Sequence, residues 1–201
     1  MDDHQLHSDQ ASTFKQRAAR KLLAWFKWRV YAPPLPGPRG VLIFYPHTSN
    51  WDFALTMLAK WSIGMKVRWL VKDSLFNGVF GKLVGPILRS WGGEPIERNS
   101  SSGNIERLAK RFHAADWFWL ALSPEGTRKY RPTWRGGFYY IALAAKVPLA
   151  IGFIDFATKR CGILGYLELT GDKEVDLTNL RAMYAGMQGL HPENAAPIVL
   201  P

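Results

Sequence analysis

Short apolar runs alternate with helical patterns along most of the chain, and this alternation constrains the fold more than any other feature. Apolar runs that suit β-strands cover residues 41–45, 66–71, 117–122, 147–154 and 163–169. Helical periodicity covers residues 52–63, 74–91, 105–114 and 137–146. Strands that alternate with helices are typical of α/β domains with a largely parallel sheet. Because 201 residues suit one domain, we expect a single α/β domain with a mostly parallel central sheet flanked by helices.

The two ends of the chain differ from this pattern. Residues 14–31 predict a basic amphipathic helix, and the proline-rich residues 33–38 predict a stiff extended connector that ends it. We therefore divide the chain into an N-terminal appendage, residues 1–38, and a compact domain, residues 39–201. Within the final stretch, residues 171–201, we expect one helix near residues 179–188 and an extended end.

The charge of the chain favours anionic partners. It has 26 Lys and Arg residues against 16 Asp and Glu residues, a formal net charge of +10. Such a field attracts nucleic acid, an anionic membrane surface or phosphorylated metabolites, and charge alone does not choose among them. Trp117 and Trp119 lie in a strand pattern that predicts burial, and no nucleic-acid motif is present, so we expect no nucleic-acid partner.

Two helices raise the question of lipid contact. Residues 14–31 combine Trp, Phe and Leu on one face with Lys and Arg elsewhere, which suits either an interfacial membrane helix or an ordinary surface helix. The very apolar residues 74–91 suit either a buried core helix, kinked at Pro86, or a surface that lines an acyl-chain groove or contacts lipid.

The expected location follows from what the sequence lacks. A single cysteine, Cys161, excludes a disulfide framework and any cysteine-based zinc cluster. The first residues do not resemble a secretory signal, and no apolar run approaches the ~20 residues of a membrane-spanning helix. His47, His113 and His191 lie far apart in the sequence, so we expect no metal site. These features lead us to expect a cytoplasmic protein.

The first candidate site follows the first strand of the compact domain. It reads Pro-His-Thr-Ser-Asn-Trp-Asp and contains His47 and Asp52. Five residues apart on a straight helix, these side chains would point in different directions, so they meet only if His47 lies in the turn and Asp52 in the first turn of the next helix. An aspartate bound to one ring nitrogen leaves the other nitrogen free as a base. Alternatively, Asp52 only caps the helix.

Two further loops carry charged residues. In the first, Gly92-Gly93 permits a tight turn ahead of Arg98, whose planar guanidinium suits a phosphate. The second, residues 124–129, follows a very apolar strand: glycine allows a ligand close to the backbone, threonine adds a hydroxyl, and Arg128-Lys129 add charge. The simpler alternative for the second loop is a solvent-exposed turn in which Glu125 pairs with Arg128.

Together these loops resemble the glycerolipid acyltransferase superfamily, which includes the bacterial 1-acylglycerol-3-phosphate acyltransferases. The family's H-x-x-x-x-D block corresponds to His47–Asp52, and its Gly-Gly-x-Pro-x-x-Arg-like block to Gly92–Arg98. Its Pro-Glu-Gly-Thr-Arg block corresponds to Pro124–Arg128, and its Val-Pro block to Val147-Pro148. All four occur in the family's order, within residues 41–154.

The resemblance implies transfer of a fatty acyl group from acyl-CoA or acyl carrier protein to a hydroxyl of a glycerol phosphate or lysolipid. His47 would be the general base, oriented by Asp52, and no cofactor beyond the thioester donor is implied. Arg98 and Arg128 would hold the phosphate of the acceptor. Glu125, Gly126 and Thr127 would shape the acceptor site.

Some features depart from the family pattern. Tyr45-Pro46 precede the histidine where many members have asparagine, and Lys129 stands where serine is frequent. These departures leave the acceptor open. A member of this size would reach lysolipid as a peripheral protein at the inner membrane face, with residues 14–31 on the anionic surface. Two alternatives stay open: a thioesterase or other hydrolase that uses the same His-Asp pair, and a non-catalytic protein that binds anionic membranes or nucleic acid.

Overall fold

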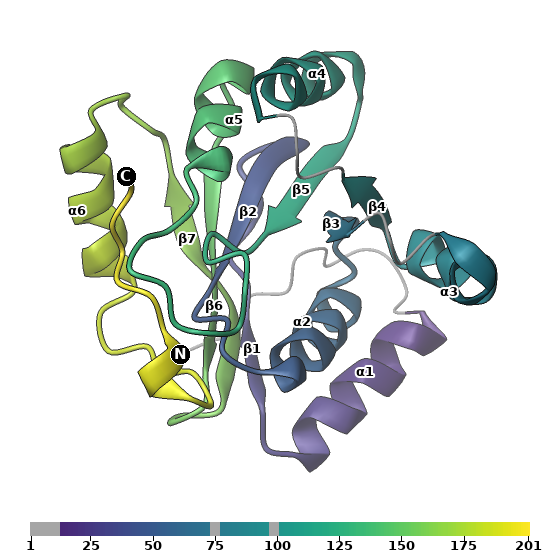
Figure 1. The fold of residues 1–201 in the computed structure, drawn as a ribbon. Coiled ribbons are helices and arrows are strands. Elements are labelled where there is room, and N and C mark those ends of the chain that lie inside the picture. Colours follow the sequence, from purple (N-terminus) through teal and green to yellow (C-terminus); the bar gives the residue numbers. More distant parts are fainter. Residues whose placement is uncertain (1–12, 73–76, 97–100) are drawn as a thin grey trace.

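The protein is an α/β domain built on one seven-stranded sheet (Figure 1). The computed structural model describes residues 13–72, 77–96 and 101–201. The strands are β1 (Arg29–Tyr31), β2 (Arg39–Tyr45), β3 (Arg68–Lys72), β4 (Gly93–Ile96), β5 (Phe118–Leu122), β6 (Leu149–Asp155) and β7 (Arg160–Leu167). Their order across the sheet is β1-β7-β6-β2-β5-β3-β4. All pairs are parallel except β6 with β7, which confirms the predicted fold class.

Helices cover both faces of the sheet. The helices are α1 (Phe14–Trp25), α2 (Asn50–Ile63), α3 (Gly78–Ser90), α4 (Ser101–Ala114), α5 (Gly137–Ala145) and α6 (Lys173–Met183). Helices α1, α2 and α3 lie on one side of the sheet, and α4, α5 and α6 on the other (Figure 1). A sheet covered on both faces must be apolar on both faces, and all seven residues of β6 are buried.

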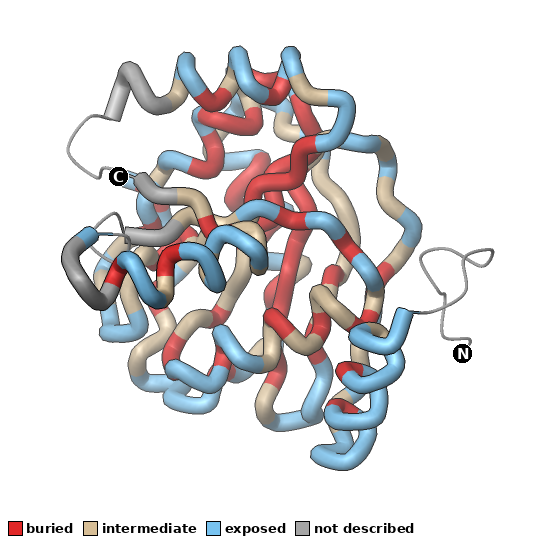
Figure 2. Tube along the Cα trace, turned by 90° about the vertical axis from the view of Figure 1, so that its right-hand side faces the viewer, coloured by how far each residue is buried: buried red, intermediate tan, exposed pale blue. Residues whose placement is uncertain are grey.

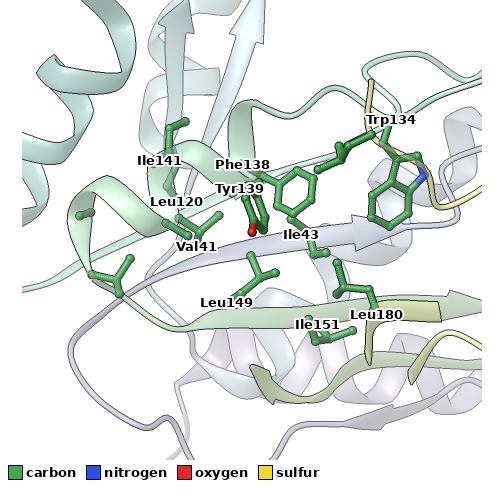
Figure 3. Packing of buried hydrophobic residues seen from close by; sticks show 14 of the residues in the cluster. Val41, Ile43, Leu120, Trp134, Phe138, Tyr139, Ile141, Leu149, Ile151 and Leu180 are labelled. Carbon is green, nitrogen blue, oxygen red and sulfur yellow. The ribbon is translucent and has the colours of Figure 1, made fainter. Parts of the chain in front are cut away.

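The larger part of the core lies between the sheet and the helices α4, α5 and α6. Alternate residues of the central strands point to this side, as Val41 and Ile43 of β2 do, and pack with Phe138 of α5 and Leu180 of α6 (Figure 3). Leu42, the residue between them, packs on the other side of the sheet instead. In Figure 2 the buried residues run through the interior of the domain, whereas most of the outer turns are exposed.

The N-terminal helix is shorter than predicted. Helix α1 ends at Trp25, and Lys27 adopts a left-handed conformation with φ of 60°. Residues 29–31 then form β1 and pair in parallel with β7, so the helix predicted over residues 14–31 was wrong beyond residue 25. Gly162 of β7 permits this pairing, because a Cβ there would overlap the carbonyl oxygen of Tyr31. The expectation that the compact fold starts only near Arg39 was therefore also wrong, since β1 belongs to the sheet.

Helix α3 is more exposed than a core helix. It begins at Gly78, and the start predicted at residue 74 lies outside the described residues. Its buried positions include Gly81 and Gly85, whereas Leu83 is 76% exposed and Ile87 is also exposed. The alternative of a fully buried core helix was therefore wrong for the face of α3 that carries Leu83 and Ile87.

Three other expectations need correction. The edge strand β4 was missed, because Gly93 and Pro95 are uncommon in strands, although proline is tolerated at an edge. Helix α6 ends at Met183 rather than extending to residue 188. Trp119 is fully buried as predicted, but Trp117 lies before β5 and is exposed.

Candidate active site

The loop between β2 and α2, residues 46–49, carries His47 and is called the His47 loop below. Ser49 is the N-cap of α2, and its hydroxyl accepts a hydrogen bond from the amide of Trp51 at 3.2 Å. His47 therefore lies in the turn and Asp52 in the first turn of the helix, as predicted. His47 Nδ1 lies 3.1 Å from Asp52 Oδ2, which confirms that the two side chains meet.

Asp52 is held in one orientation by the backbone of the same loop. Its side chain is fully buried, and Oδ2 also accepts the amide hydrogens of Thr48 at 2.7 Å and Ser49 at 2.8 Å. A carboxylate accepts hydrogen bonds, so the proton of a neutral His47 ring lies on Nδ1 and Nε2 keeps its lone pair. The His47 side chain is 23% exposed, so solvent or a substrate can approach the ring.

Glu125 lies beside the His47 loop because β2 and β5 are neighbouring parallel strands. Ile43 of β2 is in register with Leu122 of β5, so the segments that follow the two strands emerge side by side. Glu125 is buried, and its Oε2 accepts the amide hydrogen of His47 at 2.6 Å. It is therefore not paired with Arg128 on the surface, and that alternative was wrong.

The second oxygen of Glu125 binds the C-terminal part of the chain. Oε1 accepts the amide hydrogen of Ala196 at 3.0 Å. Burial raises the pKa of Glu125 from its usual 4.5 to about 7, although the two amide donors oppose this shift. The carboxylate thus joins three segments that are far apart in the sequence: the His47 loop, the loop after β5 and the C-terminal residues.

The rest of the Pro-Glu-Gly-Thr-Arg block forms a turn at the same edge of the sheet. Gly126 has a φ of +64°, a left-handed conformation that favours glycine, and a Cβ there would lie 2.9 Å from Arg135 Cδ. Thr127 Oγ1 accepts the amide hydrogen of Lys129 at 3.3 Å. Arg128 extends outward from this turn and is exposed.

A hollow of about 330 Å³ lies next to the His47 loop. Its lining residues come from the His47 loop, the start of α2, the loop after β5 and the C-terminal residues: Thr48, Ser49, Asn50, Trp51, Arg128, Leu190 and His191. Among them, sequence reasoning singled out Arg128 as a ligand-binding residue but missed Leu190 and His191. No local pattern could have found these two, because long-range contacts bring them to the site.

The two remaining predicted blocks are Gly92–Arg98 and Val147-Pro148. Arg98 falls outside the described residues. Val147-Pro148 precedes β6, so it lies at the amino ends of the strands, opposite the His47 loop, where Pro148 O accepts the amide hydrogen of Val41 at 3.0 Å.

Within the described ranges, no three His, Cys, Asp or Glu side chains are grouped so that they could hold a metal ion. Across the same ranges, no helix has the length and apolar character that crossing a membrane requires.

The parallel order of β2, β5 and β3 and the helices on both faces define an α/β fold that carries the His-Asp pair at the carboxyl edge of its sheet. The crystal structure of the 1-acyl-sn-glycerophosphate (LPA) acyltransferase PlsC from Thermotoga maritima shares this fold, with a TM-score of 0.54. The match covers 84% of this chain and 76% of that one, at 14% sequence identity. No protein-family model and no curated protein sequence matches the chain.

Proposed function

We propose that this protein is an O-acyltransferase that moves a fatty acyl group from a thioester to a hydroxyl of a glycerol phosphate or lysolipid. The thioester donor is acyl-CoA or the acylated form of acyl carrier protein. The observation that carries this proposal is the 3.1 Å contact between His47 Nδ1 and the buried carboxylate of Asp52, at the carboxyl edge of the sheet. The fold shared with PlsC and the order of the four sequence blocks support the same reaction class.

In this reaction His47 acts as the general base. Nε2 removes the proton of the acceptor hydroxyl while its oxygen attacks the thioester carbonyl carbon. The resulting tetrahedral intermediate collapses, the carbon–sulfur bond breaks, and the proton passes from His47 to the departing thiolate. Asp52 stabilises the imidazolium that forms in between, and a well-placed base of this kind contributes about 10²–10⁴-fold to the rate.

The acceptor occupies the hollow beside the His47 loop. Arg128 holds its phosphate, because a guanidinium offers several donors to a phosphomonoester. Gly126 and Thr127 shape the turn that presents Arg128, and Arg98 is proposed as a second phosphate-binding residue on the family resemblance alone. Glu125 acts on the acceptor site indirectly, through the backbone of the His47 loop.

The surface of α1 is proposed to contact an anionic membrane at the inner membrane face. Ala19 and Leu23 are buried, and Arg20 Nε donates to the carbonyl of Ser62 in α2 at 2.9 Å, so α1 is packed on the domain. Trp25 is nevertheless 79% exposed, and Phe26 next to it is also exposed. Exposed aromatic residues among lysines and arginines are typical of interfacial helices. Leu83 on α3 adds apolar surface on the same side of the sheet.

The membrane proposal is tested with vesicles and the full-length chain. Replacing Trp25 and Phe26 by serine should weaken binding to vesicles that contain phosphatidylglycerol several-fold, and raised salt should weaken wild-type binding further. Val175→Ser, an exposed position on the opposite side of the sheet, serves as the matched control. Equal vesicle binding by the double variant and the wild type would contradict the proposal.

The reaction is tested with labelled acyl-CoA and acyl carrier protein against a panel of lysolipids. Wild type should form acylated product, and His47→Ala should lose it. His113→Ala is the matched control, because His113 is an exposed histidine on α4 at the amino end of the sheet. If the protein releases only free fatty acid, and does so only when His47 is present, it is a thioesterase instead. The absence of any reaction with either donor would contradict both enzyme proposals.

A further inference from the structure

The C-terminal segment, defined here as residues 189–196, forms one wall of the hollow next to the His47 loop. We propose that His191 in this segment forms, together with Arg128, a subsite for the anionic headgroup of the acyl acceptor, and that this subsite determines acceptor specificity. The inference rests on the acyl transfer proposed above. It adds a residue that lies outside all four sequence blocks.

The segment is held against the His47 loop by close packing at its start. Gly189 is buried, and a Cβ there would lie 2.5 Å from Thr48 Oγ1 and 2.9 Å from Thr48 Cγ2, closer than atoms can approach. The hydroxyl of Thr48 also accepts the amide hydrogen of His191 at 3.2 Å. His191 is therefore positioned by the residue that directly follows His47.

A second set of contacts holds the segment and its neighbours on the domain. Ala196 N donates to Glu125, whose other oxygen binds the amide of His47. Just before the segment, Gln188 O accepts the amide hydrogen of Phe156 at 2.9 Å. Just after it, Val199 O accepts the amide hydrogen of Trp134 at 2.8 Å. In Figure 1 the yellow C-terminal residues run beside the loop that follows β5.

The chemistry of the hollow favours an anion attached to an apolar body. Arg128 and His191 are its two side chains able to carry positive charge, and they come from different segments. His191 Nδ1 lies 3.6 Å from Glu193 Oε1, an arrangement that leaves Nε2 available to a ligand. Trp51 and Leu190 complete the lining with apolar surface. A phosphomonoester on an acylglycerol matches both features.

The kinetic test compares two acceptors that differ only in the phosphate: 1-acylglycerol 3-phosphate and 1-monoacylglycerol. His191→Ala should raise the KM for the phosphorylated acceptor about tenfold, as expected for one lost hydrogen bond to a charged group, and leave kcat nearly unchanged. The KM for monoacylglycerol should not change. His113→Ala, the matched control, should change neither value. An unchanged KM for 1-acylglycerol 3-phosphate in His191→Ala would overturn the inference while leaving the acyl transfer itself intact.

A binding measurement separates this inference from the proposed reaction. Glycerol 3-phosphate is titrated into the wild-type protein while the imidazole proton signals of the histidines are followed by NMR. We expect the signal that disappears in His191→Ala to shift on titration, and that of His113 to stay in place. If His191 shifts but no acyl transfer is found, the anion subsite holds and the proposed reaction fails. If the His191 signal does not respond, the subsite is refuted.

Discussion

The His47 loop and the C-terminal segment line the same hollow, but different kinds of contact hold them there. In the His47 loop, Asp52 binds groups no more than five residues away: the ring of His47 and the amides of Thr48 and Ser49. The C-terminal segment reaches its partners over 71 residues at Glu125 and 143 residues at Thr48. The proposed catalytic pair is thus built by local geometry, and the proposed headgroup wall by tertiary contacts.

This difference predicts where function should be most sensitive. A change at Asp52 acts directly on the proposed base. A change in the C-terminal segment alters the fit of the acceptor and leaves the His-Asp contact in place. Glu125 contacts both regions, so its substitution should produce an intermediate effect.

The largest expected effect comes from Asp52→Asn. The amide is uncharged and cannot stabilise an imidazolium at His47, so kcat should fall about 10²–10⁴-fold. Acyl-transfer assays of purified, folded protein measure this change. Asp176→Asn is the matched control: Asp176 is equally buried and accepts a hydrogen bond from Tyr139 at 2.8 Å, far from His47 in the fold. If both variants lost the same activity per folded molecule, the loss would be structural.

Glu125→Gln should have the next largest effect. Each oxygen of Glu125 accepts one backbone amide hydrogen, and a glutamine turns its NH₂ group toward one of these donors. A buried donor left without an acceptor costs about 1–3 kcal/mol, so the free energy of unfolding should fall by that amount. The His47 loop should also shift and lower kcat about 10- to 100-fold. An unchanged kcat in the folded variant would show that Glu125 does not position His47.

The same residue predicts a dependence of stability on pH. Burial raises the pKa of Glu125 from 4.5 to about 7, so between these values the folded protein retains a proton that the unfolded chain has released. This contribution to the free energy of unfolding is present below pH 4.5 and is lost as the pH rises through about 7. Urea unfolding at about pH 5 and about pH 7.5 should show wild type losing stability relative to Glu125→Gln. A difference that is constant with pH would contradict this assignment.

The smallest expected effect comes from Gly189→Ala. The added methyl group would collide with Thr48 and push the C-terminal segment away from the His47 loop. Overpacking of this kind costs about 1–3 kcal/mol, and we expect a several-fold increase in the KM of the acceptor with a smaller change in kcat. Gly137→Ala is the control, because no atom lies within 4 Å of a Cβ at that position. If Gly189→Ala lowered kcat as much as Asp52→Asn, the C-terminal segment and the His47 loop would not have the separate roles proposed here.

Much of the fold could be predicted from the sequence. The alternation of apolar runs and helical patterns predicted the parallel strands β2, β3, β5 and β6 together with the helices between them. The error at the N-terminal helix has a specific cause. Val30 continues the helical periodicity of α1, but it packs with Trp28 beside Cys161 once β1 pairs with β7. The energy of sheet pairing outweighed the local pattern, as tertiary context commonly does.

The candidate site also contains one part that local sequence suggested and one part that it did not. From the sequence, His47 and Asp52 could meet if a turn were followed by the first turn of a helix, with helix capping by Asp52 alone as the alternative. The structure brings the two side chains to 3.1 Å. The position of Glu125 was not predicted, because its burial depends on the register of β2 with β5 and on the C-terminal residues that cover it.

By itself, the sequence determined the fold class, through the alternation of apolar runs with helical patterns, and showed that His47 and Asp52 could meet, because these two residues lie close together in the chain. The tertiary structure alone decided that Glu125 joins the His47 loop to Ala196, and that Leu190 and His191 line the hollow with Arg128. These contacts form only when segments as many as 143 residues apart are packed together. The pattern of residues within one segment does not show which distant segment it will contact.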